Sequence, residues 1–144
     1  MNMNRIKFEA FLNTYKFKKY ADIVSNGKHA CFENKQVEKA NSGYVYIWIE
    51  KDKSKFTVRY VGNAGTTMRK RCNEQVGGFR GGSTVGIKHS TNILKGIKAG
   101  KSYEVYARIS KVGTVVGEPK ISFCTVEESA FIEKLKPSWN SIKK

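Results

Sequence analysis

The sequence is most informative at Tyr44-Val45-Tyr46-Ile47-Trp48-Ile49, an unbroken run of aromatic and β-branched residues. Side chains alternate between the two faces of a strand, so this run places aromatic rings on one face and aliphatic side chains on the other. A turn signal, Lys51-Asp52-Lys53-Ser54, follows, and a second strand is expected from about Phe56 to Val61. The two strands are therefore predicted to pair as a β-hairpin.

Helices and one further strand are predicted around this hairpin. Phe8, Phe11, Leu12 and Tyr15 recur at helical spacing, so residues 5–20 are expected to form an amphipathic helix with a basic outer face. Residues 21–42 show no clear period and are expected to be a linker or an irregular arm. Further helices are expected at about 67–76, 87–99 and 126–136, a strand at about 103–109, and a flexible glycine-rich loop at 77–86.

These elements predict an α+β fold. We expect a small central antiparallel three-stranded sheet flanked by helices in residues 43–144. A helical N-terminal arm, residues 1–42, is expected to precede it.

The charge of the chain predicts a polyanionic partner. Its 144 residues include 27 Lys and Arg against 12 Asp and Glu, a formal net charge of +15 at pH 7. Basic side chains release condensed counterions when they meet phosphates, so nucleic acid is the first candidate. The alternatives are a well-solvated surface or an acidic protein partner.

Composition also argues against two classes of protein. No apolar run approaches the ~20 residues of a membrane span, and no apolar stretch follows the first residues as in a secretory signal. The three cysteines, Cys31, Cys72 and Cys124, are scattered and odd in number. They are expected to be reduced thiols, which predicts a cytoplasmic protein rather than a membrane protein or a secreted disulfide scaffold.

A carboxylate and two arginines stand at informative positions in the predicted helices. Glu128 lies on the same helical stripe as Phe131, where a carboxylate is costly unless it is paired or bound to a metal ion. The alternative is a capping box, because Thr125 precedes Glu128 at the required spacing. In the earlier helix, Arg69 and Arg71 flank the apolar stripe on opposite sides, and periodicity does not choose between them.

Four short segments, taken in order along the chain, carry a resemblance to a known family. They are Tyr44-Val45-Tyr46-Ile47, Tyr60-Val61-Gly62, Met68-x-x-Arg71, and Glu128-x-x-Phe131-Ile132 followed by Pro137-Ser138-Trp139-Asn140. Together they resemble the signature of the GIY-YIG nuclease superfamily over roughly residues 43–142. Within that family, the stretch from Gly100 to Arg108 and the ending Pro-x-Trp-Asn-x-x-Lys are most similar to the small phage endonucleases.

The chain departs from the family pattern around the hairpin and the first helix. Tyr44 stands where the first signature carries glycine, with Gly43 beside it. The interval from Gly62 to Arg71 is one residue longer than in most members. Arg69 is therefore a rival for the role of the family's arginine.

Two further departures concern the rest of the expected site. Gln75 stands where many members carry His or Tyr, one turn after the arginine, so His89 or a lysine is expected to substitute. Glu127 is a rival for Glu128, although the spacing to Ile132 favours Glu128.

The resemblance implies a metal-dependent DNA endonuclease that uses one divalent cation and leaves 5′-phosphate and 3′-hydroxyl ends. Glu128 would be the one protein ligand of that cation; Mg²⁺ suits a carboxylate, and Mn²⁺ is expected to substitute. Arg71 would hold the scissile phosphate, and Tyr46 would be the general base or would position the water. Tyr60 would hydrogen-bond the nucleophile or the phosphate, and Asn140 would hold the site together.

Tyr46 needs positive charge nearby for this role, because a free phenol has a pKa near 10. His89 or one of the lysines of the hairpin turn is expected to supply it. The residues expected to bind DNA are Lys51, Lys53, Lys55, Arg69, Lys70, Phe79, Arg80 and Lys88. Of these, Phe79 and Arg80 stand at the tip of the glycine-rich loop, from which they would reach into a groove.

Double-stranded DNA is the implied partner, in a phage or restriction-type role. One active site cuts one strand, so a double-strand cut predicts a homo-oligomer or two visits by one chain. The N-terminal segment would contact DNA through Lys16, Lys18 and Lys19, or mediate dimerisation through Phe8 and Phe11. The alternative function is a catalytically silent nucleic-acid-binding protein with the same fold.

Overall fold

The fold is organised around strand β4 (Tyr44–Asp52), which lies inside a six-stranded antiparallel sheet. The computed structural model describes residues 1–141. The strand order is β1-β5-β4-β6-β2-β3. The other strands span Asn2–Met3 (β1), Lys18–Ser25 (β2), Ala30–Glu33 (β3), Lys55–Ala64 (β5) and Ser102–Ile109 (β6).

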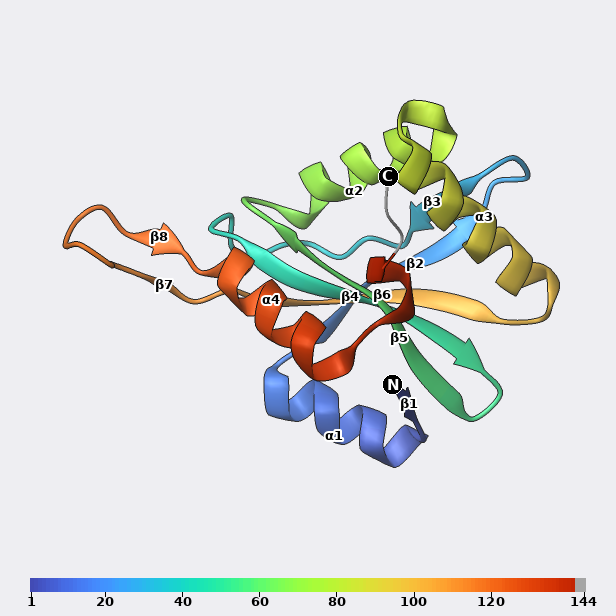
Figure 1. The fold of residues 1–144 in the computed structure, drawn as a ribbon, viewed down its shortest axis with the longest axis horizontal. Helices are drawn as coiled ribbons and strands as arrows, with labels where there is room; N and C mark the ends of the chain where they lie inside the picture. Colours follow the sequence, from blue (N-terminus) through green and yellow to red (C-terminus); the bar gives the residue numbers. More distant parts are fainter. Residues whose placement is uncertain (142–144) are drawn as a thin grey trace.

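Helices cover both faces of this sheet (Figure 1). On one face lie α2 (Met68–Gly77) and α3 (Thr84–Lys98), and on the other lie α1 (Arg5–Tyr15) and α4 (Cys124–Leu135). Because both faces are covered, every residue of β4 from Tyr44 to Glu50 is buried. The predicted α+β class is confirmed.

The side-chain alternation predicted for β4 is also confirmed. The aromatic face of β4 consists of Tyr44, Tyr46 and Trp48, and its aliphatic face consists of Val45, Ile47 and Ile49. The aromatic face packs in one core cluster with Met68 of α2 and Ile93 of α3. The aliphatic face packs in a second cluster with Phe8 of α1 and Phe131 of α4.

The sheet has six strands rather than the three that were predicted. Residues 18–20, expected at the end of the N-terminal helix, and residues 21–33, expected in an irregular arm, contain β2 and β3, and β2 pairs with β6. A bulge between Lys19 and Ala21 puts two consecutive side chains, Tyr20 and Ala21, in the interior. This bulge hides the alternation from a sequence pattern. The N-terminal helix accordingly ends at Tyr15 and not near residue 20.

The glycine-rich segment 77–86 is helical rather than a loop. A π-helical turn (Gly78–Gly82) follows α2, and α3 begins directly after Ser83, whose hydroxyl caps it. Phe79 is 4% exposed and packs against Trp48. The expectation that Phe79 reaches DNA from a loop tip is therefore wrong, because the core covers its ring.

After β6 the chain forms a ribbon that projects beyond the sheet (Figure 1), with β7 (Val112–Gly113) paired to β8 (Ile121–Ser122). The chain then enters α4 after Phe123, whose side chain makes no capping hydrogen bond. Thr125 thus lies inside α4 and not at its N-cap position, so the capping box considered for Thr125 and Glu128 is not formed. Within residues 1–141, no helix has the length and apolar character that a membrane crossing needs.

Candidate active site

Tyr46 lies at the centre of the sheet, directly opposite Gly62 in the register of β4 with β5. Its side chain is completely buried. A Cβ added at Gly62 would overlap the ring and hydroxyl of Tyr46, so only glycine lets the phenol lie directly against the β5 backbone. This close approach is the physical reason for the glycine that ends the second tyrosine segment.

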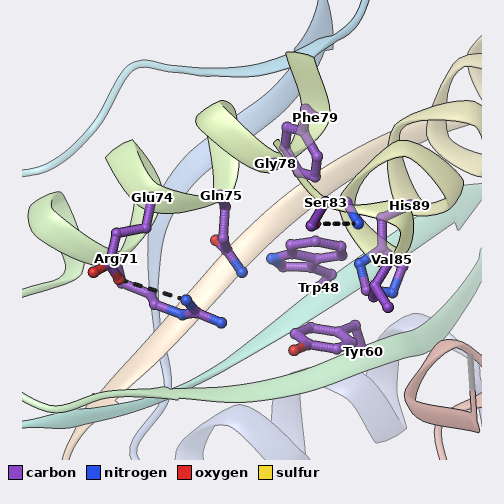
Figure 2. Close-up of a pocket in the computed structure, with 11 residues that line it drawn as sticks. Trp48, Tyr60, Arg71, Glu74, Gln75, Gly78, Phe79, Ser83, Val85 and His89 are labelled. Atoms are coloured by element: carbon purple, nitrogen blue, oxygen red, sulfur yellow. Dashed lines mark hydrogen bonds and ion pairs between the residues drawn. The ribbon is translucent and has the colours of Figure 1, made fainter. Parts of the chain in front are cut away.

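Two side chains of α2 donate hydrogen bonds to the Tyr46 hydroxyl. Gln75 Nε2 donates at 2.6 Å and Arg71 Nε at 3.3 Å. Residues four apart lie one turn apart on the same face of a helix, which brings both donors to one oxygen. Figure 2 shows both side chains extending from α2 toward the sheet. The other amide atom of Gln75, Oε1, is buried and has no hydrogen-bond partner within residues 1–141.

The structure separates the two arginines that periodicity left open. Arg71 is half-buried and contacts Tyr46. Arg69 is exposed, and its backbone N–H donates to the Glu38 carboxylate at 3.0 Å. Arg71 is therefore the arginine placed beside Tyr46, and it also reaches Glu74 at 3.5 Å.

Glu128 of α4 lies beside Asn63 of β5 and faces the same region as Arg71. Burial raises the pKa of Glu128, while a hydrogen bond from the Asn63 side chain and the charge of Arg71 lower it to a smaller extent. The charge of Arg71 therefore acts on the Glu128 carboxylate, in the direction that favours its ionised form. The sequence pattern did not identify Asn63, whose only signal is its position directly after Gly62.

The neighbouring carboxylate, Glu127, has a different environment. Its Oε2 accepts a hydrogen bond from the Lys111 N–H at 3.0 Å and lies 3.6 Å from Arg108 Nη2. These contacts tie the start of α4 to the end of β6. Of the two rival glutamates, Glu128 is therefore the one that faces Arg71.

The Tyr46 phenol is held in its protonated form. Burial raises the pKa of Tyr46 well above its usual value of 10, Tyr60 raises it further, and Arg71 lowers it by less. Loss of this proton therefore needs additional positive charge close to the oxygen. Arg71 and Gln75 are the two groups that already point donors at that oxygen.

A pocket of about 130 Å³ opens beside Arg71 and Gln75 (Figure 2). Tyr60 and His89 form one wall of it, with ring centroids 5.0 Å apart. Tyr46 does not line this pocket, because Arg71 and Gln75 lie between it and the open space. A molecule in the pocket therefore meets Tyr60 and His89 directly, and Tyr46 only past the two donors.

His89 does not supply positive charge to this pocket. Burial lowers the pKa of His89 below its ordinary value of 6.5, and the hydrogen bond from its Nε2 to the Trp139 carbonyl (3.3 Å) opposes that shift only in part. The imidazole is therefore neutral at pH 7. The expectation that His89 would favour the Tyr46 phenolate by its charge is wrong.

The lysines of the hairpin turn lie far from Tyr46. Tyr46 and Lys51 are five residues apart on β4, which is about 17 Å at ~3.4 Å per residue. Lys51 Nζ lies 5.7 Å from the Phe56 ring centroid, in the cluster of the aliphatic face. Lys53 and Lys55 lie further along the turn, so none of the three is positioned to favour the phenolate.

The remaining residues expected to bind DNA are on the surface. Arg69 and Lys70 are exposed on α2, Arg80 is exposed in the π-helical turn, and Lys88 is exposed on α3. Their exposure is compatible with contact to a polyanion, and their role in binding DNA stays a prediction.

Asn140 joins the C-terminal 3-10 helix (Ser138–Ser141) to the edge of β5. Its Nδ2 donates to the Val61 carbonyl and its Oδ1 accepts from the Val61 N–H, both at 2.8 Å. The amide therefore completes the hydrogen bonding of the strand beside Gly62. Asn140 acts on the site through the backbone.

The donors near Glu128 suit a hard cation. The Glu128 carboxylate supplies oxygen donors, the type that Mg²⁺ and Mn²⁺ prefer. Within residues 1–141 no group of three or more His, Cys, Asp or Glu side chains gathers as a ready metal cage. A cation here would be held by Glu128, with water and substrate oxygens in its other positions.

The fold is similar to that of two solved nuclease structures. No family model and no curated protein sequence matches this chain. A mutant of bacteriophage T4 EndoII is similar with a TM-score of 0.66 and 22% identity, over 92% of this chain and 96% of that one. The restriction endonuclease HPY188I, in complex with product DNA, is similar with a TM-score of 0.50 and 20% identity, over 93% of this chain and 82% of that one. At these identities the similarity establishes the fold.

Proposed function

We propose that this protein is a metal-dependent DNA endonuclease of the GIY-YIG type. The observation that carries the proposal is the contact of Arg71 and Gln75 of α2 with the Tyr46 hydroxyl of β4, together with the effect of the Arg71 charge on Glu128 of α4. Endonuclease activity in the proteins of similar fold supports the reaction, and the net charge of +15 supports DNA as substrate.

In the proposed reaction, water attacks phosphorus and the bond to the 3′ oxygen breaks. Tyr46 first loses its own proton to solvent; the phenolate oxygen then accepts a proton of the attacking water, and the leaving 3′ oxygen takes up a proton from solvent water. Arg71 and Gln75 hold the phenolate that the proton transfer needs, and Arg71 turns part of its guanidinium toward the phosphate. Because Tyr46 is buried behind these two side chains, they shift when a phosphate enters the pocket.

Glu128 holds the divalent cation, Mg²⁺ or Mn²⁺, in this proposal. Bound there, the cation supplies Lewis-acid stabilisation of the phosphate charge and lowers the pKa of nearby oxygen acids. Asn63 orients the Glu128 carboxylate by its hydrogen bond, and burial of Glu128 strengthens its preference for a positive partner.

The test compares two adjacent carboxylates. Supercoiled plasmid is incubated with Mg²⁺ and the wild-type protein, Glu128→Gln or Glu127→Gln. We expect Glu128→Gln to abolish nicking, since it removes the cation ligand, and Glu127→Gln to retain it, since Glu127 binds Arg108 and Lys111 instead. Equal nicking by wild type and Glu128→Gln would remove Glu128 from the mechanism. Linear product from a single-site chain would indicate a homo-oligomer or sequential cuts.

A second candidate function is a nucleic-acid-binding protein without catalysis. The complete burial of Tyr46 and its raised pKa favour it, because the proposed base is both covered and protonated. This candidate predicts no cleavage with either Mg²⁺ or Mn²⁺ and binding of duplex DNA that weakens with salt. Cleavage that disappears in Glu128→Gln would exclude it.

A further inference from the structure

A second, larger groove lies at the end of the sheet near Tyr46. It has a volume of about 690 Å³. Its walls come from the end of α1 and the start of β2, from segment 36–39, and from the ends of β4 and β6. Most of its lining therefore belongs to the N-terminal part of the chain, outside the segments that resemble a nuclease signature.

The lining of this groove is strongly basic. Its charged residues are Lys16, Lys18, Lys19, Lys39, Arg108 and Glu38. Two of the cations have partners: Lys19 pairs with Asp22 at 2.8 Å and Glu104 at 2.7 Å, and Arg108 pairs with Glu127 at 3.6 Å.

Three lysines of the groove are left without an acidic partner. Lys16, Lys18 and Lys39 are exposed and form no ion pair within residues 1–141. Three like charges around one groove repel each other, and this repulsion is relieved when a polyanion enters.

The single carboxylate of the groove does not offset this charge. Both oxygens of Glu38 accept hydrogen bonds from the first N–H groups of α2, those of Met68 and Arg69. Its negative charge is therefore directed at the positive end of the helix rather than at the groove. The same contact joins the groove to the helix that carries Arg71.

The groove and the active-site pocket share no lining residue, but two elements, β4 and α2, connect them. On β4, Tyr44 lines the groove and stands two residues, about 7 Å, before Tyr46. On α2, Glu38 contacts the first turn, and Arg71 follows one turn later.

We infer that this groove holds the sugar-phosphate backbone of the DNA beyond the cut position, with Lys16, Lys18 and Lys39 each contacting a phosphate. The inference rests on the proposed function for the identity of the polyanion. The N-terminal segment thereby gains a role in binding DNA. The lysines of the hairpin turn lie at the opposite end of β4 and do not reach this groove.

The test measures the salt dependence of binding. A fluorescein-labelled duplex of random sequence is titrated without divalent metal by wild type, by a groove variant and by a control variant. The groove variant carries Lys16→Asn, Lys18→Gln and Lys39→Gln; Asn is chosen at position 16 because it tolerates the positive φ of 62° found there. The control variant carries Lys28→Gln, Lys95→Gln and Lys98→Gln, three exposed lysines outside both pockets.

We expect the log–log salt slope of the groove variant to be shallower by about 2.7, at ~0.9 for each phosphate that is no longer neutralised. Between about 50 mM and about 200 mM salt, wild type would therefore lose about 40-fold more affinity than the groove variant. The control variant should keep the wild-type slope. Equal slopes for the groove and control variants would overturn the inference.

Two further readouts keep the result interpretable. If the triple variant melts below wild type, the pair Lys18→Gln and Lys39→Gln leaves the α1 cap intact and should still change the slope by about 1.8. Plasmid cleavage is measured in parallel. If wild type cleaves plasmid and the groove variant keeps the wild-type salt slope, the proposal that the groove binds DNA is contradicted and the endonuclease proposal is not. A slope change in a protein that does not cleave defeats the endonuclease proposal alone, and wild-type binding independent of salt defeats both.

Discussion

The two faces of strand β4 carry different chemistry, although their residues alternate along the same strand. The aliphatic face packs against α1 and α4 in a cluster made of aliphatic and aromatic side chains. The aromatic face packs against α2 and α3, where Arg71, Gln75 and His89 are brought in among the rings. Helices and polar groups occur on both faces, since Arg108 pairs with Glu127 of α4 beside the aliphatic face, but the donors that contact Tyr46 belong to the aromatic face.

This difference has an energetic consequence. Apolar packing on the aliphatic face requires no hydrogen bonds, so it contributes to stability wherever shape is matched. On the aromatic face, the buried Tyr46 hydroxyl is satisfied by Gln75 and Arg71, and a buried polar group without partners costs roughly 1–3 kcal/mol. We therefore expect substitutions on the aromatic face to act mainly on chemistry, and those on the aliphatic face on stability.

Tyr46→Phe should have the largest effect on activity. It removes the proposed base while keeping the ring against Gly62, so plasmid nicking should fall by about 10²–10⁴-fold. The two donors on α2 also lose their acceptor, which should lower the melting temperature modestly. Tyr103→Phe is the control for loss of a buried hydroxyl, because Tyr103 lies in the same aromatic cluster but bonds Glu50 away from the pocket. Nicking by Tyr46→Phe at the wild-type rate would show that the aromatic face does not carry the chemistry.

Ile47→Ala should have the opposite signature. It deletes a fully buried side chain between β4 and the helices α1 and α4, which costs about 2–5 kcal/mol in the free energy of unfolding. The specific activity of the folded fraction should stay close to wild type. Urea unfolding gives the first quantity, and nicking at a temperature where both proteins are folded gives the second. A large loss of activity without loss of stability would contradict the division between the faces.

The fold was predictable where hydrophobic periods are regular. Residues 44–49 form an unbroken run of aromatic and aliphatic residues because β4 is buried on both faces, and they predicted β4; β5 and β6 were predicted from residues 56–61 and 103–109. The β2 strand was not predicted because its bulge breaks the alternation of buried and exposed side chains at Tyr20 and Ala21. The helical segment 78–82 was not predicted because glycines are typical of loops.

The candidate site was predictable at its signature positions and not at its neighbours. The structure brings Tyr46 and Arg71 into contact, and the charge of Arg71 acts on Glu128, while the roles of all three stay predictions. The residue of β5 that lies opposite Tyr46 depends on the register of β4 with β5, which no residue type specifies. The position of Asn63 depends on how α4 crosses β5, and that crossing is a property of tertiary packing.

Gln75→Met should weaken activity by less than Tyr46→Phe. It keeps the volume of the side chain and removes the 2.6 Å hydrogen bond to the Tyr46 oxygen. A hydrogen bond to a charged group contributes about 1.5–3 kcal/mol, so nicking at neutral pH should fall by about 10–100-fold. Because the donor favours the phenolate, its loss raises the pKa of Tyr46 further and moves the rise of the pH–rate profile to higher pH.

Glu74→Gln is the matched control for Gln75→Met, since Glu74 is exposed on the same turn of α2 and contacts Arg71 only at 3.5 Å. It should leave the pH–rate profile in place. A lower rate for Gln75→Met with an unshifted profile would mean that Gln75 supports packing and does not act on the Tyr46 proton.

The smallest expected effect is on the pH dependence of stability, and it also distinguishes the two faces. Burial lowers the pKa of His89 below 6.5, so the unfolded chain binds a proton at this residue more readily than the folded chain does. Its contribution to the free energy of unfolding is therefore complete above about pH 6.5 and is lost as the pH falls through the folded pKa. His89→Phe keeps a ring against Trp48 and removes this titration.

The melting temperature of wild type should therefore fall more between neutral and mildly acidic pH than that of His89→Phe. His29, the other histidine of the chain, lies in the turn between β2 and β3, and His29→Gln is the control for replacing a histidine outside the aromatic face. The control matters because carboxylates titrate in the same direction in all three proteins, so only the difference between variants reports on His89. If His89→Phe keeps the full acid dependence, the imidazole is accessible to protons in the folded state, and the aromatic face is more open to water than its packing indicates.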